Sequence, residues 1–91
     1  MKTLVIIPAK DEQRKIERVV KEIVQNGWPV LVVDDGSQDD TALAAKAAKA
    51  AVISHPLNRG QGAALKTGID YAIIHGFSQV VFFDADGQMM A

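Results

Sequence analysis

The sequence predicts an α/β fold in which helices on both faces of a parallel β-sheet form three layers. Four short, mostly apolar runs have the length and composition of buried strands. Segments with helical spacing of apolar residues separate these runs, and most of the runs end abruptly in polar residues. This alternation is typical of parallel strands joined by right-handed crossovers. For such a doubly wound, Rossmann-like unit we expect the strand order 3-2-1-4. The four runs are Leu4–Ile7, Val30–Val33, Ala51–Ser54 and Val80–Phe83.

The first strand, Leu4–Ile7, should end at Pro8, and a helix should follow over residues 11–25. Asp11 is a suitable N-cap residue for that helix. Asn26 and Gly27 supply a C-terminal stop signal. The apolar residues of this segment recur with the helical period and predict one buried stripe: Ile16, Val19, Val20, Ile23 and Val24.

The second strand, Val30–Val33, is followed at once by two acidic residues, Asp34 and Asp35. Further along, Ser37 and Asp40 fit a capping box for a second helix over residues 41–50. A short third strand, Ala51–Ser54, should then lie at an edge of the sheet.

The third helix follows the loop 55–62 and should end at Gly76. Its apolar residues Leu65, Ile69, Ala72 and Ile73 keep the helical period. Gly68 inside this helix should cost about 1 kcal/mol relative to alanine. We expect that glycine to allow close packing of the helix on the sheet.

The fourth strand, Val80–Phe83, has four large apolar residues and should be buried on both faces. It is followed by Asp84-Ala85-Asp86-Gly87-Gln88. In an extended chain, residues two apart point the same way, so Asp84 and Asp86 can converge on one cation. With Gln88 they form a set of oxygen ligands suited to Mg²⁺ or Mn²⁺. The alternative is a solvated acidic turn.

Ligands of open parallel sheets bind outside the carboxyl ends of the strands, where the strand order reverses. Three polar stretches should meet there, at residues 8–12, 34–35 and 84–88. One of Asp34 and Asp35 can accept hydrogen bonds from a nucleobase or a ribose, although turn and capping roles suit the pair as well. Lys10 can neutralise the acidic rim or contact a phosphate.

Composition excludes several classes of function. The 91 residues suffice for one domain, and a formal net charge of −1 gives no basic surface for nucleic acid. The chain has no cysteine, so thiolate metal sites are excluded. No apolar segment approaches the roughly 20 residues of a membrane span. We therefore expect a soluble chain with a cytoplasmic location. His55 and His75 stand alone in the sequence and are expected to be structural or exposed.

Four motifs, in this order and at this spacing, resemble those of the family 2 glycosyltransferases of GT-A fold. The similarity is greatest to the branch that transfers sugars to dolichyl or polyprenyl phosphate, and it covers nearly the whole chain. The motifs are Ile7-Pro8-Ala9-Lys10-Asp11-Glu12, Val33-Asp34-Asp35-Gly36-Ser37 with Asp40 and Thr41, Asn58-Arg59-Gly60-Gln61-Gly62-Ala63-Ala64-Leu65, and Asp84-Ala85-Asp86-Gly87-Gln88.

The resemblance implies a binding site for a nucleoside-diphosphate sugar such as a GDP- or UDP-hexose. It implies that Asp84 and Asp86, flanking Ala85, hold a divalent metal ion that bridges the diphosphate, with Gln88 as a further ligand. The metal would stabilise charge on the departing diphosphate during displacement at the anomeric carbon. The residues that would border the base and the ribose are Pro8, Lys10, Glu12, Val33 and Asp35.

GT-A domains continue well beyond the metal motif, and the missing part brings the acceptor site and any catalytic base. We therefore interpret residues 1–91 as the N-terminal, nucleotide-sugar-binding half of a longer enzyme. The resemblance implies an acceptor such as a polyprenyl phosphate or a glycan, and leaves membrane association of the parent enzyme open. The fragment itself should transfer no sugar. Its fourth strand should form an exposed edge that favours self-association.

Two other readings remain. Asp84 and Asp86 also resemble the nucleophile and the acid/base of haloacid-dehalogenase-type phosphatases, although that motif normally follows the first strand of its fold. Trapping an aspartyl adduct with beryllofluoride would identify a phosphatase. A non-catalytic nucleotide-binding module on the same scaffold is the second alternative, and it would bind nucleotide without any parent activity.

Overall fold

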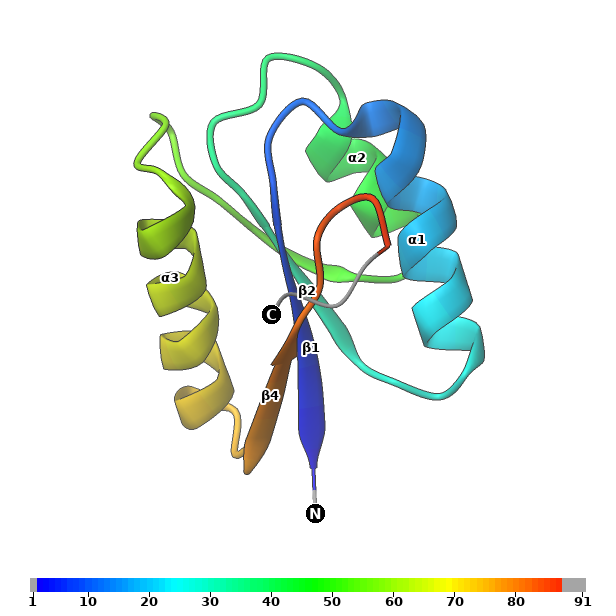
Figure 1. The fold of residues 1–91 in the computed structure, drawn as a ribbon, viewed down its shortest axis with the longest axis vertical. Helices are drawn as coiled ribbons and strands as arrows, with labels where there is room; N and C mark the ends of the chain where they lie inside the picture. Colours follow the sequence, from blue (N-terminus) through cyan, green and yellow to red (C-terminus); the bar gives the residue numbers. More distant parts are fainter. Residues whose placement is uncertain (1, 88–91) are drawn as a thin grey trace.

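The computed structural model describes residues 2–87, and within them one four-stranded parallel sheet of order β3-β2-β1-β4 (Figure 1). The predicted strand order and direction are therefore confirmed, and β3 and β4 form the two edges of the sheet. In chain order the elements are β1 (Thr3–Ala9), α1 (Gln13–Gln25), β2 (Val30–Asp34), α2 (Thr41–Ala47), β3 (Ala51–Ser54), α3 (Gln61–Ile74) and β4 (Gln79–Phe82).

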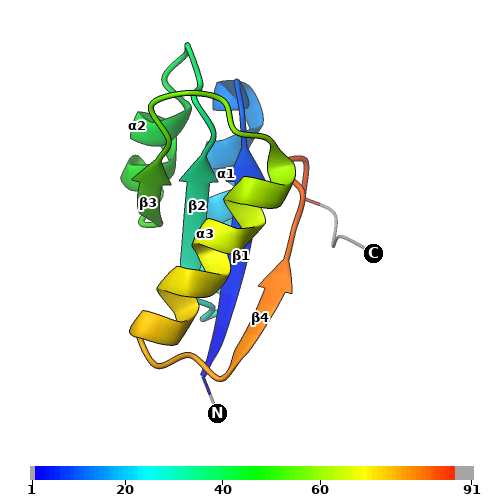
Figure 2. The ribbon, with the colours of Figure 1, turned by 90° about the vertical axis from the view of Figure 1, so that its left-hand side faces the viewer.

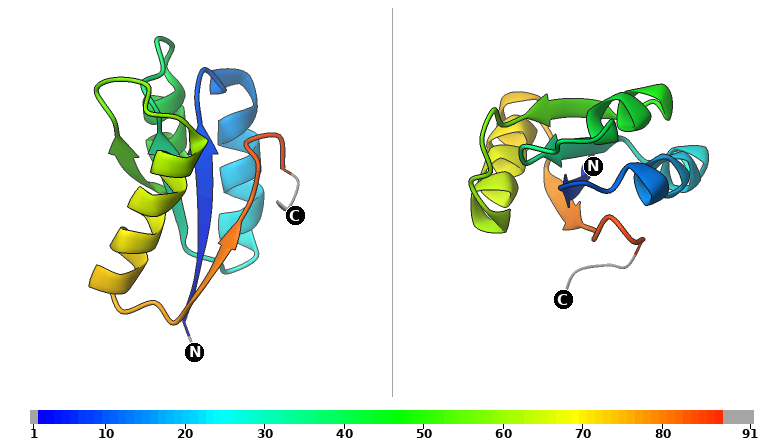
Figure 3. Two further views of the ribbon diagram at one scale, coloured as in Figure 1. Left: turned by 60° about the vertical axis from the view of Figure 1, so that its left-hand side comes forward. Right: turned by 90° about the horizontal axis from the view of Figure 1, so that it is seen from above.

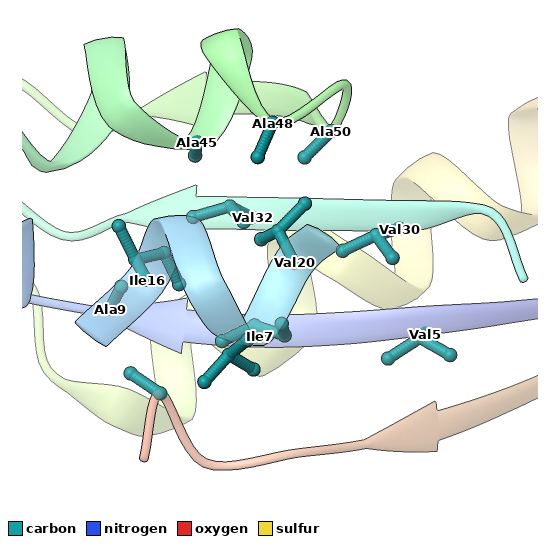
Figure 4. Packing of buried hydrophobic residues seen from close by; sticks show 12 residues of the cluster. Val5, Ile7, Ala9, Ile16, Val20, Val30, Val32, Ala45, Ala48 and Ala50 are labelled. Atoms are coloured by element: carbon teal, nitrogen blue, oxygen red, sulfur yellow. The ribbon is translucent and has the colours of Figure 1, made fainter. Parts of the chain in front are cut away.

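Helices cover both faces of the sheet, which confirms the three layers. Figure 3 shows α1 and α2 together on one side and α3 alone on the other. Successive residues of β1 and β2 point to opposite faces, so each strand contributes to two apolar clusters. The cluster under α1 and α2, part of which appears in Figure 4, includes Ile7, Ile16 and Val32. The cluster under α3 includes Ile6 and Leu31.

The first strand is longer than predicted, because Pro8 lies within β1 instead of ending it. The N–H groups of Val5 and Ile7 face β2, as the bond from Val5 N–H to the Pro29 carbonyl illustrates. The missing N–H of Pro8 therefore faces the β4 side. Regular pairing with β4 stops at Ile6, so no ladder hydrogen bond is lost at Pro8.

The predicted local caps of α1 and α2 are wrong. Asp11 has a left-handed φ of 55° and precedes the N-cap residue Glu12, and neither helix has a side-chain cap from its own N-cap residue. Ser37 and Asp40 form no capping box. Helix α2 also ends at Ala47, before the predicted residue 50. Lys49, at a φ of 81°, reverses the chain into β3.

The buried face of α3 is not made by the large apolar residues that keep the helical period. Ile69 is 39% exposed and Ile73 is 70% exposed, whereas Ala64, Gly68 and Ala72 are buried. These three residues are spaced four apart and form a row of small side chains against the sheet. A β-carbon added at Gly68 would lie 2.6 Å from Cγ2 of Ile6. The predicted role of Gly68 in close packing is thus confirmed, while the large apolar residues lie off the contact face.

This contact makes Gly68→Ala destabilising although alanine favours helices. The added methyl group must displace the fully buried Ile6, and overpacking of that kind costs about 1–3 kcal/mol against a gain of about 1 kcal/mol in helix propensity. We expect a net loss of about 1 kcal/mol in the free energy of unfolding, measured by urea denaturation. The matched control is Gly62→Ala in the same helix, which has no neighbour within 4 Å and should be neutral or stabilising. Equal effects of the two substitutions would contradict the contact.

Strand β4 is half-buried and does not have the two covered faces that its composition predicts. Gln79 is exposed, and the side chains of Val80, Val81 and Phe82 are only partly buried. The reason is its position, because β4 pairs with β1 on one side and has no described strand on the other.

No helix among the described residues is long and apolar enough to cross a membrane.

Candidate functional site

A cavity of about 520 Å³ lies at the carboxyl ends of β1, β2 and β4, and we call it the strand-end pocket. Figure 1 shows the loops after β1, β2 and β3 and the turn after β4 at the same end of the sheet, as parallel strands require. The pocket is lined by Pro8, Ala9, Lys10, Glu12, Lys15, Asp35, Asn58, Gly60, Gln61, Ala64, Asp84, Ala85 and Asp86.

The structure brings together most of the residues proposed from the sequence. Pro8, Lys10, Glu12, Asp35, Asp84, Ala85 and Asp86 all line the strand-end pocket. The exception is Val33, whose side chain is 0% exposed and packs in the core under α3. The predicted contact of Val33 with a base therefore does not fit its position. Gln88 lies outside the described residues.

Asp84 and Asp86 reach the pocket by a different backbone path from the predicted extended chain. The Gly87 N–H donates to the Asp84 carbonyl at 2.9 Å, which closes a turn, and Gly87 has a φ of 96°. Ala85, at 6% exposed, packs in the core under α1 and α2 and anchors this turn. Both aspartates still line the same pocket, and their convergence on one cation stays a prediction.

Asp35 is 5% exposed, and protein donors already surround its carboxylate. Oδ1 accepts hydrogen bonds from the Arg59 N–H and from Nδ1 of His55, both at 2.9 Å. Oδ2 accepts one from the Gly60 N–H at 2.8 Å. Asp35 therefore ties β2 to the loop before α3. Its contact with a nucleotide stays a prediction, whereas its role in holding this loop is visible.

Asp34 has a local role. Its Oδ1 accepts a hydrogen bond from the Ser37 N–H at 3.0 Å, and its Oδ2 accepts one from the Ser54 hydroxyl at 3.4 Å. These bonds shape the turn after β2 and join it to β3. Of the two neighbouring aspartates, only Asp35 lines the strand-end pocket.

The loops after β1 and β2 hold each other in place, which replaces the predicted local caps. The Asp11 N–H donates to the Ser37 hydroxyl, and the Gln38 N–H donates to Asp11 Oδ1, each at 2.8 Å. The Glu12 N–H donates to the Thr41 hydroxyl at 2.9 Å. The amides just before α1 thus find acceptors in the loop before α2 and at its first residue, a pairing between residues 26 to 29 positions apart.

Asp39 belongs to the same junction. The hydrogen bond from the Thr41 hydroxyl is the main reason that its pKa lies below the ordinary 3.8. A second donor is the N–H of Gln13, whose side-chain Oε1 in turn accepts from the Asp40 N–H. Asp39 therefore serves the starts of both helices, because it accepts from the Thr41 hydroxyl in its own loop and from the Gln13 N–H across the junction.

Sequence reasoning missed one wall of the strand-end pocket. That wall comes from the loop before α3 and the first turn of the helix, through Asn58, Gly60, Gln61 and Ala64. Lys15 of α1 was missed as well. The sequence shows the motif that contains Asn58 and Gly60, but nothing in its residue types predicts that it lines the same pocket as Asp84. An adjoining cavity of about 610 Å³ shares Lys10 and Asn58 with the pocket.

The residues of the pocket fit a hard divalent cation that is shared with a ligand. Carboxylate oxygens suit Mg²⁺ and Mn²⁺, and Mg²⁺ is usually held by one or two carboxylates together with water and substrate phosphates. Asp84 and Asp86 meet that requirement. Among residues 2–87, no group of three or more histidine, cysteine, aspartate or glutamate side chains gathers to hold a metal on its own. Such an ion would complete its shell with water and phosphate oxygens, and Gln88, the further predicted ligand, lies outside the described residues.

The pKa of Asp35 predicts a loss of stability in acid. Burial raises this pKa, but the hydrogen bonds from Arg59, His55 and Gly60 outweigh burial and hold it below the ordinary value of 3.8. The ionised carboxylate therefore contributes stability above about pH 3.8, and the contribution is lost as the pH falls through the lower folded-state pKa. Asp35→Asn should cost about 2–3 kcal/mol at pH 7 and flatten the acid limb of stability against pH. Asp70→Asn, at an exposed pair with Lys66, is the control and should change little.

Comparison with known proteins agrees with this arrangement. The family model described as "Glycosyl transferase family 2" matches residues 4–91. A UDP-N-acetylglucosamine–dolichyl-phosphate N-acetylglucosaminyltransferase of Methanococcus voltae is 34% identical over 101 residues, covering 91% of this chain and 40% of that protein. The polyprenol monophosphomannose synthase of Mycolicibacterium smegmatis is 40% identical over 95 residues, covering 94% of this chain and 36% of that protein.

A solved structure gives the same picture at the level of the fold. The glucosyl-3-phosphoglycerate synthase of Mycobacterium tuberculosis, crystallised with Mn²⁺, UDP and glucosyl-3-phosphoglycerate, superposes with a TM-score of 0.71 and 31% identity. The match covers 92% of this chain and 33% of that one. The chain thus spans about a third of the length of the proteins it matches. Its sheet is the corresponding part of a GT-A fold, and the chain belongs to glycosyl transferase family 2.

Proposed function

We propose that the strand-end pocket is the donor site of a glycosyltransferase that transfers a hexose from a GDP- or UDP-sugar. The observation that carries this proposal is that Asp35, Asp84 and Asp86 come from two different strand ends and line one cavity. Lys10 and Lys15 line the same cavity and supply positive charge beside a diphosphate. The adjoining cavity of about 610 Å³ gives room for the rest of a nucleotide.

In this proposal Asp84 and Asp86 would hold Mg²⁺ or Mn²⁺, which when bound stabilises negative charge on the departing diphosphate. Gln88 stays a predicted further ligand. The turn closed by Gly87 keeps the two carboxylates on the pocket side, because Ala85 is anchored in the core. The wall made by Asn58, Gly60 and Gln61 would place two amide side chains, those of Asn58 and Gln61, beside a nucleotide. The predicted contacts to the base and the ribose involve Pro8, Lys10, Glu12 and Asp35.

The acceptor of the parent enzyme is proposed from its relatives. The names of the two similar enzymes include dolichyl phosphate and polyprenol monophosphomannose, so a polyprenyl phosphate is the acceptor we favour over a glycan. Residues 1–91 would be the N-terminal donor-binding half, on the cytoplasmic side, with the acceptor site supplied by further sequence. The 91-residue chain should bind donor nucleotide weakly and transfer no sugar.

Calorimetric titration of the chain with UDP and with GDP tests the donor site. We expect one of the two nucleotides to bind in the presence of MnCl₂, and we expect binding to disappear when EDTA removes the metal. CMP at the same concentration is the control, because it lacks the diphosphate. Absence of metal-dependent binding of both nucleotides, in a chain that circular dichroism shows to be folded, would contradict the proposal.

Neither alternative has support among these observations. The residues that resemble a phosphatase nucleophile motif follow β4, the fourth strand in chain order among residues 2–87, and not the first. The family match runs through them from residue 4 onward. A non-catalytic nucleotide-binding module would share the pocket, and sugar transfer by the parent enzyme separates it from the transferase.

We also propose that the chain self-associates through β4. The outer edge of this strand has no described partner, and half-buried Val81 and Phe83 line an apolar groove of about 410 Å³ against α1 and the 48%-exposed Trp28. Exposed strand edges recruit other strands. Sedimentation velocity should show a concentration-dependent dimer that Val81→Lys weakens, while Leu43→Lys on α2, 64% exposed, leaves it unchanged. A monomer at every concentration would refute this.

A further inference from the structure

A buried chain of polar side chains lies directly behind the strand-end pocket, and the proposed function leaves part of it unused. His55 follows β3 and is 7% exposed. Its Nδ1 contacts Oδ1 of Asp35, and its Nε2 contacts the hydroxyl of Thr67 on α3, both at 2.9 Å. Three elements that are distant in sequence, β2, β3 and α3, are thus joined through one imidazole ring. We call this set the Asp35–His55–Thr67 chain.

The geometry determines which nitrogen of the ring carries the proton. Asp35 has a lowered pKa, so it is ionised at neutral pH and can only accept hydrogen bonds. Nδ1 of His55 must therefore be the donor. In a neutral ring Nε2 then has a lone pair and accepts from the Thr67 hydroxyl. Every bond of the chain has a donor and an acceptor, and among the described residues no buried side-chain nitrogen or oxygen lacks a partner.

The Asp35–His55–Thr67 chain holds one wall of the strand-end pocket in place. The loop before α3 has no regular structure, and α3 has no side-chain cap from its own N-cap residue, Gly60. The Asp35 carboxylate instead holds the two residues just before the helix, by accepting from the N–H groups of Arg59 and Gly60. Figure 2 shows this loop crossing the top of the sheet from β3 to the start of α3. The position of Gly60 relative to Asp84 across the pocket therefore depends on how firmly Asp35 is oriented.

We propose that His55 and Thr67 are positioning residues for the nucleotide site, acting by fixing the orientation of the Asp35 carboxylate toward the loop before α3. This inference rests on the proposed donor-binding function for its effect on affinity. A directional bond at each end of the ring restrains Asp35 more tightly than apolar packing could, because hydrogen bonds weaken steeply as their angle changes. A charged acceptor also makes the bond to Nδ1 stronger than a neutral one.

The test compares Thr67→Val and His55→Leu with His55→Asn, whose amide nitrogen can replace Nδ1 as donor. Hydrogen exchange of the Arg59 and Gly60 amides, followed by NMR without ligand, reports on the loop. We expect exchange to accelerate about tenfold in His55→Leu, which loses two hydrogen bonds, and about threefold in Thr67→Val, which loses one. In His55→Asn the exchange rate should return close to that of the unmodified chain. The ring carbon and nitrogen shifts of the unmodified chain should show the Nδ1–H tautomer.

The affinity for UDP or GDP with Mn²⁺ should fall by similar factors in the same variants. The control is Thr3→Val, which loses an exposed bond of 3.0 Å to Gln79 at the opposite end of the sheet and should change neither readout. Unchanged amide exchange in Thr67→Val and His55→Leu, or an Nε2–H tautomer, would overturn the positioning role. If the unmodified chain binds no nucleotide, the donor-site proposal fails. The amide exchange, which is measured without ligand, still tests the positioning role of His55 and Thr67.

Discussion

Replacing Asp84 with asparagine is expected to abolish metal-dependent binding of the donor nucleotide. The substitution keeps the size of the side chain and one oxygen, but it removes the charge that a hard cation requires. Changes that only touch a metal's outer partners already lower metal affinity about 10- to 100-fold. Loss of one of two direct carboxylate ligands should therefore raise the apparent Kd by about 100-fold or more. Titration calorimetry with MnCl₂ and UDP or GDP measures it.

Two comparisons make this result specific. Asp86→Asn should give a loss of similar size, because both carboxylates line the same pocket. Asp70→Asn removes an equivalent charge on exposed α3, where Asp70 pairs with Lys66, and should leave the affinity unchanged. If Asp84→Asn bound nucleotide and metal as tightly as the unmodified chain, Asp84 would not be a metal ligand and the donor site would need another metal-binding group.

Gly36→Ala is expected to damage both stability and the pocket. Gly36 has a φ of 79°, and a β-carbon there would lie 2.8 Å from the backbone nitrogen of Asn58. The backbone conformation alone costs about 1–2 kcal/mol for a residue with a side chain. Overpacking against the loop before α3 adds about 1–3 kcal/mol. We expect a loss of about 2–5 kcal/mol in the free energy of unfolding, measured by urea denaturation.

Gly27→Ala separates the two causes. Gly27 has a φ of 90° but no neighbour within 4 Å of the added carbon, so it should show the conformational cost alone. The difference between the two variants then measures the contact between Gly36 and the loop. Because Asn58 and Gly60 line the pocket, Gly36→Ala should also weaken nucleotide binding. Equal losses of stability at Gly27 and Gly36 would show that the loop yields without cost.

The strands and their order could be predicted because they follow from the short-range pattern of apolar residues. Four apolar runs separated by helical periods leave few alternatives to a parallel sheet, and the connection rules then favour the order 3-2-1-4. Helix α1 was predicted for the same reason, since Ile16, Val19 and Val20 form a regular stripe and are all buried. Where one face of an element must be apolar, composition and spacing are sufficient to predict the element and its buried face.

Prediction was wrong where packing partners decided the outcome. In α3 the large residues Ile69 and Ile73 suggested the buried face, but the close approach to Ile6 admits only Ala64, Gly68 and Ala72. At the starts of α1 and α2, residues with capping ability were assigned to their own helices. Two of them, Asp11 and Ser37, instead bond to each other across the two loops, from the Asp11 N–H to the Ser37 hydroxyl. Neither the buried face of α3 nor these contacts between loops can be predicted without the surface against which each element packs.

The same division applies to the site. By itself, the sequence determined the fold class, the carboxyl ends as the place where Asp35, Asp84 and Asp86 meet, and the resemblance to glycosyl transferase family 2. Only the tertiary structure decided that Asp35 faces backbone amides of the loop before α3, that Val33 is buried, and that this loop forms the opposite wall. The physical reason is that periodicity records burial along one element, whereas hydrogen-bond partners are set by which loops meet in space.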